Sequence, residues 1–151
     1  MALSIVLTAE HGYAIAVIVA LWFQQQFIFT LPVALARKKY GIEPPTMYPR
    51  DSQIKSLSLT EAQVDDYMCV QRVHQNNMEF LVAFFPLMII SSIMFPMQSA
   101  HGGAVVWLGR MLTAIGYWRG AEKRMWGAWF HFGEYYIWYL AGKSALTLIN
   151  M

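Results

Sequence analysis

Four apolar stretches, separated by polar and turn-forming segments, set the pattern of this chain. A helix that crosses a membrane needs about 20 mostly apolar residues. The pattern therefore predicts an all-α integral membrane protein, a bundle of four transmembrane helices in a single domain covering residues 1–151. We expect these helices at about 12–36, 61–95, 104–119 and 125–149.

The connections between these stretches differ in charge, and this difference predicts the orientation in the membrane. Residues 37–60 begin with three consecutive basic residues, and residues 119–124 contain three more, whereas residues 95–103 contain none and indicate a tight turn. Because basic residues gather on the cytoplasmic side, both basic connections are predicted there and both termini on the other side. Thr60-Glu-Ala-Gln63 has the form of a capping box, which predicts that the second helix begins at Glu61.

A polar stripe precedes the second apolar stretch. Arg72, Asn76 and Glu79 are spaced four and three residues apart, so on a helix they share one face. Ionisable groups at membrane depth are costly unless they face protein, water or a ligand. The stripe is therefore either part of a functional site or a structural polar seam between packed helices, and the spacing leaves both interpretations open.

Composition supports the membrane class. Hydrophobic residues make up 57% of the chain and charged residues 13%, about half the usual charged share of a soluble domain. The net charge of +2 is too small to indicate a nucleic-acid partner. Cys69 is the single cysteine, so no disulfide framework is expected within the chain.

Several cations are expected to meet on the cytoplasmic side. The predicted topology places Arg37, Lys38, the start of the Arg72 stripe and Arg124 there. A cluster of cations with one carboxylate and one amide suits a small ligand that carries carboxylates and an ammonium group. The alternative is that the basic residues only set the topology at the lipid headgroups.

Two other polar features are interpreted as structural. Arg110 lies 14 residues before Arg124, about 21 Å along a continuous helix, so we expect it to bond to polar groups of the first or second helix instead of sharing a site. His131 and Glu134 have the spacing of a metal-binding pair. Without further ligands they indicate a hydrogen bond, and no metal site is predicted.

Three segments of the sequence carry a resemblance to a known family. They are Ala-Arg-Lys-Lys-Tyr-Gly-Ile-Glu-Pro-Pro at 36–45, the signature Arg-x-His-Gln-Asn-x-x-Glu at 72–79, and the pairs Gly109-Arg110, Gly116-Tyr117 and Lys123-Arg124. Together they extend over most of residues 12–127. On these motifs the chain resembles the membrane-associated proteins in eicosanoid and glutathione metabolism, and within that family the microsomal glutathione S-transferases.

The resemblance implies a homotrimer that holds glutathione, as a co-substrate, between adjacent subunits at the cytosolic side. Arg124 matches the catalytic arginine that stabilises the glutathione thiolate; a guanidinium stays charged at any working pH, so it acts as an electrostatic stabiliser. By correspondence, the expected glutathione ligands are Arg72, Asn76, Glu79 and Tyr117 from one subunit and Arg37 and His74 from its neighbour, with Lys38 at a position that is often basic.

The activity implied by the resemblance is that of a membrane-bound glutathione transferase or peroxidase. It would conjugate glutathione to lipophilic electrophiles, as in leukotriene C4 synthesis, or reduce lipid hydroperoxides that arrive from the membrane lipid. Two alternatives stay open: a non-catalytic lipid-binding scaffold of the five-lipoxygenase-activating-protein type, and a glutathione-dependent isomerase of the prostaglandin E synthase type.

Two positions depart from the family pattern, because Phe80 and Thr113 stand where relatives have tyrosines. The segment from Pro49 to Tyr67 is also longer than in close relatives.

The resemblance also implies a location. We expect a multi-pass protein of the endoplasmic reticulum membrane in a eukaryote, or of the inner membrane in a bacterium.

Overall fold

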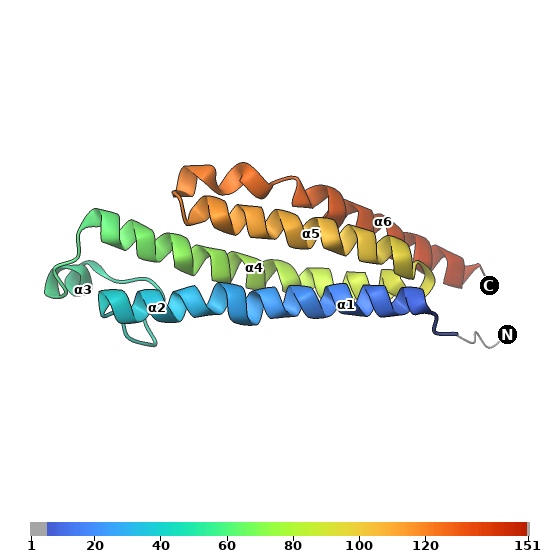
Figure 1. Cartoon of the computed structure of the whole chain (residues 1–151), viewed down its shortest axis with the longest axis horizontal. Helices are drawn as coiled ribbons and strands as arrows, with labels where there is room; N and C mark the ends of the chain where they lie inside the picture. The colour runs from blue at the N-terminus through green and yellow to red at the C-terminus, as the bar shows by residue number, and fades with distance from the viewer. Residues whose placement is uncertain (1–5, 151) are drawn as a thin grey trace.

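The computed structural model describes residues 6–150, and these fold into helices without any strand. The long helices run along a common direction, and shorter elements lie at one end of the bundle (Figure 1). In chain order the elements are α1 (Ala9–Phe23), the π-helix η1 (Gln24–Phe29), α2 (Thr30–Tyr40), α3 (Asp51–Ser56), α4 (Glu61–Met94), α5 (Pro96–Tyr117), the 3₁₀-helix η2 (Ala121–Gly127) and α6 (Phe130–Ile149).

Two helical segments in the described part of the chain are long and apolar enough to cross a membrane. They are Ala9–Tyr40, in which α1, η1 and α2 follow one another directly, and Glu61–Met94, which is α4. The mean hydropathy of the most apolar part of each is 1.7, and only 28% of that part is buried inside the molecule. Most of this apolar surface therefore faces outward, as contact with lipid would require. That α5 and α6 also cross the membrane stays a prediction.

The helix boundaries differ from the predicted ones mainly around α5. The turn predicted over residues 95–103 is much shorter, because Phe95 alone separates α4 from α5. Pro96 stands at the start of α5, where a helix needs no backbone N–H from that residue. At its other end α5 stops at Tyr117, and α6 begins at Phe130 instead of residue 125 because the intervening residues form η2.

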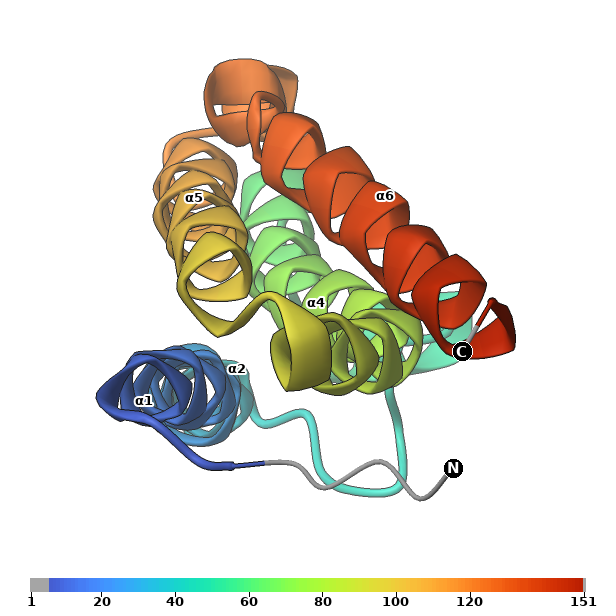
Figure 2. The ribbon, with the colours of Figure 1, turned by 90° about the vertical axis from the view of Figure 1, so that its right-hand side faces the viewer.

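Each of the other long helices contacts α4. Figure 2 shows α1 and α2 beneath α4 and α5, with α6 running diagonally along the right-hand side of the bundle. The main core cluster takes side chains from all of these layers: Leu21 of α1, Phe84 and Met88 of α4, Val106 of α5 and Ile137 of α6 are all buried. In a membrane such side chains stabilise the bundle through close packing, because lipid provides no hydrophobic driving force between helices.

A chain of buried polar side chains crosses this interior. Gln24 and Gln25 are neighbours in sequence and both buried, because the wider π-helical turn brings both to the inner side of the helix. Asn77 Nδ2 donates to Gln25 Oε1 (2.9 Å), and Arg110 Nε donates to Asn77 Oδ1 (2.7 Å). Gln24 Nε2 donates to the carbonyl of Trp107 (3.0 Å). The expected bond of Arg110 to a polar group of the second long helix is confirmed.

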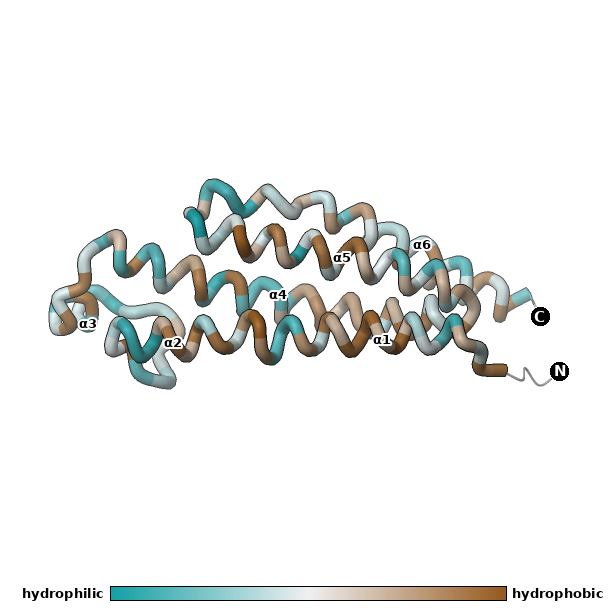
Figure 3. Tube along the Cα trace, in the orientation of Figure 1, coloured by the Kyte–Doolittle hydropathy of each residue, from teal (hydrophilic) through white to brown (hydrophobic). Residues whose placement is uncertain are grey.

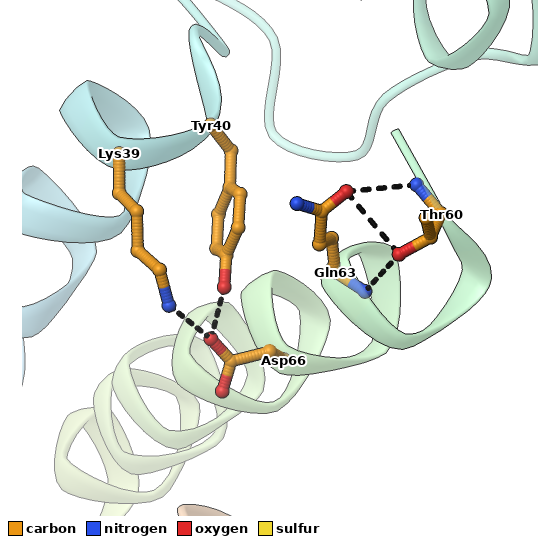
Figure 4. Close-up of polar contacts among 5 residues, drawn as sticks. All are labelled: Lys39, Tyr40, Thr60, Gln63 and Asp66. Carbon is orange, nitrogen blue, oxygen red and sulfur yellow. Dashed lines mark hydrogen bonds and ion pairs between the residues drawn. The ribbon is translucent and has the colours of Figure 1, made fainter. Parts of the chain in front are cut away.

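Polar residues gather at the end of the bundle where α2 stops and α4 starts, coloured teal in Figure 3. There Asp66 accepts hydrogen bonds from Lys39 Nζ (3.2 Å) and from the Tyr40 hydroxyl (Figure 4). The predicted capping box is confirmed, because Gln63 N donates to Thr60 Oγ1 (3.3 Å) and Thr60 N to Gln63 Oε1 (2.9 Å). These contacts hold the basic end of α2 against the first turns of α4.

Both basic connections lie toward the same end of the bundle. The end of α2, α3 and η2 are on the left in Figure 1, while the start of α1 and the end of α6 are on the right. This arrangement agrees with the expected pairing of the two basic connections on one side. Which side faces the cytoplasm stays a prediction.

Candidate functional site

The chain reverses direction after α5, and η2 folds back along that helix (Figure 1). Gly120 makes the reversal with a φ of 129°, a backbone conformation that favours glycine. Close contact of the two segments also depends on glycine, since a Cβ on Gly116 would overlap the carbonyl of Lys123 and one on Gly127 would overlap the carbonyl of Gly109. These glycines allow η2 to lie directly on α5.

We expect Gly116→Ala to destabilise the fold by about 1–3 kcal/mol, because its methyl group would force η2 away from α5. The measurement is the thermal unfolding midpoint of the detergent-solubilised protein. Gly142→Ala in α6 is the matched control: its Cβ meets nothing within 4 Å, so the change should leave stability unchanged or raise it by up to about 1 kcal/mol. Equal midpoints for the Gly116 variant and the parent protein would contradict this account of the reversal.

A cavity of about 340 Å³ lies between α4, α5, η2 and the start of α6. Four of the predicted site residues line it: Asn76 and Glu79 from α4, Tyr117 from α5 and Arg124 from η2. Within residues 6–150, Arg124 forms no ion pair, and its Nη1 donates only to the carbonyl of Ala121 (3.3 Å). The fold therefore brings polar groups from three separate elements to one cavity and leaves the charge of Arg124 uncompensated there.

Arg110 lines the same cavity, which corrects the expectation that it lies far from Arg124. That expectation assumed a continuous helix from residue 110 to residue 124, but the helix ends at Tyr117 and η2 turns back. The guanidinium of Arg110 lies between two aromatic rings, 5.0 Å from the centroid of Phe80 and 4.9 Å from that of Phe130. Cation–π attraction of this kind holds a cation in place without a carboxylate.

Both departures from the family pattern lie in the lining of this cavity. Phe80 contributes a ring to the Arg110 contact and no hydroxyl group. The hydroxyl of Thr113 donates to the carbonyl of Gly109 (3.0 Å) within α5. Tyr117 is the phenol that lines this cavity in the described part of the chain, so a ligand there meets guanidinium groups and aromatic carbon more than phenolic hydroxyls.

The remaining predicted ligands lie outside this cavity. Arg72 lines a second cavity, of about 330 Å³, together with Cys69 and Glu122, and Tyr117 lines both cavities. Arg37 and Lys38 lie near the end of α2, where Arg37 Nη1 donates to the carbonyl of Ile42 (3.3 Å). His74 contacts the π-helix through its backbone carbonyl, which accepts from Gln25 Nε2 (3.3 Å). These three residues do not meet the Arg124 cavity within one subunit.

The long connection before α4 reaches the polar stripe. Tyr67 OH donates to the carbonyl of Met47 (3.1 Å), which ties the connection to the helix. The hydroxyl of Tyr48 donates to Gln75 Oε1, and Gln75 Nε2 donates to Glu79 Oε1 (3.0 Å). The connection therefore positions Glu79 through Gln75, in addition to covering the end of the bundle.

Sequence reasoning did not assign four other residues that line the Arg124 cavity. They come from the end of η2 through the start of α6, and only the reversal after α5 brings them there. The one available signal was the spacing of His131 and Glu134. No group of three or more potential metal ligands occurs in residues 6–150. The unassigned lining residues are Met125, Ala128, Phe130 and His131.

An all-helical chain with two long, mostly outward-facing apolar segments is typical of a membrane-associated protein. Comparison with known proteins identifies the family. The model of the MAPEG family, the membrane-associated proteins in eicosanoid and glutathione metabolism, matches residues 15–145, and the chain belongs to this family. It is also 35% identical over 113 residues to an uncharacterized protein of Synechocystis sp., covering 74% of this chain and 72% of that protein.

Proposed function

We propose that this protein is a membrane-bound glutathione transferase or peroxidase of the microsomal type, with a function like that of microsomal glutathione S-transferase 3. The observation that carries the proposal is the convergence of Asn76, Glu79, Tyr117 and Arg124 on one cavity. Family membership is consistent with this role, and equally with an isomerase or an activating protein.

In this proposal Arg124 stabilises the reactive form of glutathione, its thiolate. The nucleophile is the glutathione thiolate, and a fixed cation next to a thiol favours its ionised form. Arg124 is suited to this because it lines the cavity, forms no ion pair in the described part of the chain and cannot itself lose its proton. The thiolate then attacks an electrophilic carbon and displaces its leaving group, or attacks the terminal oxygen of a hydroperoxide and releases the alcohol.

Glutathione carries two carboxylates and one ammonium group, and the stripe of α4 offers partners for each. Arg72 suits a carboxylate, Glu79 the ammonium group and Asn76 the peptide groups. Arg72 lines the neighbouring cavity, which Tyr117 connects to that of Arg124, so a bound tripeptide would extend across both. Arg37, Lys38 and His74 would complete the site from an adjacent subunit of a homotrimer.

The second substrate would come from the lipid phase. Large apolar side chains of α4 and α6, such as Val82 (75% exposed) and Phe132 (74%), point outward, so a lipophilic electrophile or lipid hydroperoxide can approach along these helices. The corresponding location is the endoplasmic reticulum in a eukaryotic cell or the inner membrane in a bacterium.

The test is glutathione binding to the detergent-purified protein by calorimetry, followed by turnover assays with an aryl halide and with a lipid hydroperoxide. We expect saturable binding at or below millimolar concentration and turnover with at least one substrate. Binding of lipid without glutathione would support the scaffold alternative, and glutathione binding with turnover of a prostaglandin endoperoxide alone would support the isomerase. Absence of glutathione binding at millimolar concentration would overturn the proposal.

A further inference from the structure

A histidine–glutamate pair lies at the rim of the Arg124 cavity. His131 Nδ1 and Glu134 Oε2 are 2.6 Å apart, one turn from each other on α6. The side chain of Glu134 is only 14% exposed, whereas that of His131 is 49% exposed and lines the cavity. The imidazole is flanked by Phe130, at a ring-centroid distance of 4.0 Å, and by Tyr135, at 5.8 Å.

This arrangement fixes which nitrogen of the imidazole is available. A carboxylate only accepts hydrogen bonds, so Nδ1 of His131 carries the proton that it shares with Glu134. In the neutral ring Nε2 is then a free acceptor, and no partner within residues 6–150 bonds to it. A carboxylate that orients an imidazole in this way also stabilises the imidazolium formed when Nε2 takes up a proton.

The proposed reaction leaves one proton without an acceptor. Ionisation of the glutathione thiol releases a proton, and Arg124 cannot accept it because a guanidinium is already fully protonated. Tyr117 carries its own phenolic proton, and Glu79 is bonded to Gln75 and is assigned to the ammonium group of glutathione. Among the remaining lining residues, His131 carries the imidazole, the side-chain type that enzymes use most often as general acid or base.

We propose that His131, oriented by Glu134, accepts the thiol proton of glutathione at Nε2 and, in the peroxidase reaction, returns it to the leaving alkoxide. This inference rests on the proposed function. In the peroxidase reaction the thiolate attacks the terminal oxygen of the hydroperoxide, the O–O bond breaks, and the alkoxide takes the proton from the imidazolium to leave as an alcohol. The sulfenic acid of glutathione then reacts with a second glutathione to give the disulfide and water. In conjugation a halide leaves as an anion, and the imidazolium returns its proton to solvent.

Charged and titratable groups come close to His131 from every element that forms the cavity. Glu134 bonds to Nδ1 of the imidazole, and the guanidinium groups of Arg110 and Arg124 line the same cavity. The titratable and charged groups involved are Glu79 of α4, Arg110 and Tyr117 of α5, Arg124 of η2, and Glu134 and Tyr135 of α6.

The test is the pH profile of turnover for His131→Gln, which removes the acid–base group and keeps a polar side chain of similar size. We expect turnover of a lipid hydroperoxide near neutral pH to fall by about 10²-fold, with glutathione affinity changed less than about threefold. The rate of the variant should rise with pH as hydroxide replaces the lost base. Imidazole added to His131→Ala should restore part of the rate, a rescue that a merely structural role would not produce.

Two further variants make the outcome decisive. Glu134→Gln removes the charge that stabilises the imidazolium and should lower turnover in the same direction but less than His131→Gln. His101→Gln replaces an exposed histidine of α5 that does not line the cavity and should leave the rate unchanged. Parent-like turnover and pH profile in His131→Gln would overturn this inference while leaving the proposed function intact. A parent protein that neither binds nor turns over glutathione would overturn both.

Discussion

Replacing Arg124 by alanine is expected to lower glutathione-dependent turnover by about 10²-fold, the usual effect of removing one group that stabilises a developing anion. The loss should appear in kcat more than in glutathione affinity, since other residues are assigned to binding the tripeptide. Steady-state kinetics with an aryl halide, combined with calorimetric binding of glutathione, measures both quantities. A decrease in the ultraviolet absorbance of the bound thiolate would show that the ionised form itself is lost.

Arg119→Ala provides the matched control for this experiment. Arg119 is an exposed arginine in the same reversal, with its guanidinium 5.6 Å from the centroid of the Trp126 indole and no place in the cavity lining. Its removal should change turnover less than about twofold, within the small energetic effect of most surface substitutions. Arg124→Lys should recover part of the rate, because lysine keeps the positive charge but lacks the planar guanidinium group with its several N–H donors. Parent-like turnover in Arg124→Ala would contradict the assigned role.

Asn77→Leu is expected to reduce stability by about 1.5–3 kcal/mol, the usual contribution of a hydrogen bond to a charged group. Asn77 is fully buried and joins Gln25 of η1 to Arg110 of α5, which is itself only 5% exposed. Leucine fills a similar volume but offers no acceptor to Arg110 Nε and no donor to Gln25 Oε1. The measurement is the thermal unfolding midpoint in detergent, followed by tryptophan fluorescence.

A matched control and a double variant separate this polar effect from simple loss of packing. Gln26→Leu changes an exposed amide of the same π-helix and should alter stability by less than about 0.5 kcal/mol. Adding Arg110→Met to Asn77→Leu removes the unpaired charge and should restore at least about 1 kcal/mol. A destabilisation below about 1 kcal/mol in Asn77→Leu, or no recovery in the double variant, would show that the buried network contributes little.

The close contact between η2 and α5 also bears on the proposed role of Arg124. Arg124 depends on η2 for its place, and η2 depends on the close approach at Gly116 and Gly127. A displacement of about 1 Å in a catalytic group can cost about 10²-fold in rate. The stability measured for Gly116→Ala tests the packing of η2 on α5. The turnover measured for Arg124→Ala tests the residue that this packing positions.

The sequence by itself determined the helical class, the apolar segments and the α4 stripe. These follow from local rules: the length of an apolar run, the helical repeat that aligns Arg72, Asn76 and Glu79, and the capping box at Thr60. The start of α4 could be predicted to the residue because the capping interaction lies within four consecutive residues. The family resemblance likewise rested on short motifs, and the family-model match over residues 15–145 agrees with it.

Only the tertiary structure decided which polar groups share a cavity. A continuous-helix assumption separated Arg110 from Arg124 by about 21 Å, whereas the reversal after Tyr117 brings both, with His131, to the same cavity. The π-helix that buries Gln24 and Gln25 together was equally absent from the hydrophobic pattern. The physical reason is that the reversal and the π-turn depend on contacts between segments, such as a glycine facing a carbonyl or an amide facing a guanidinium, and helical periodicity contains no information about such contacts.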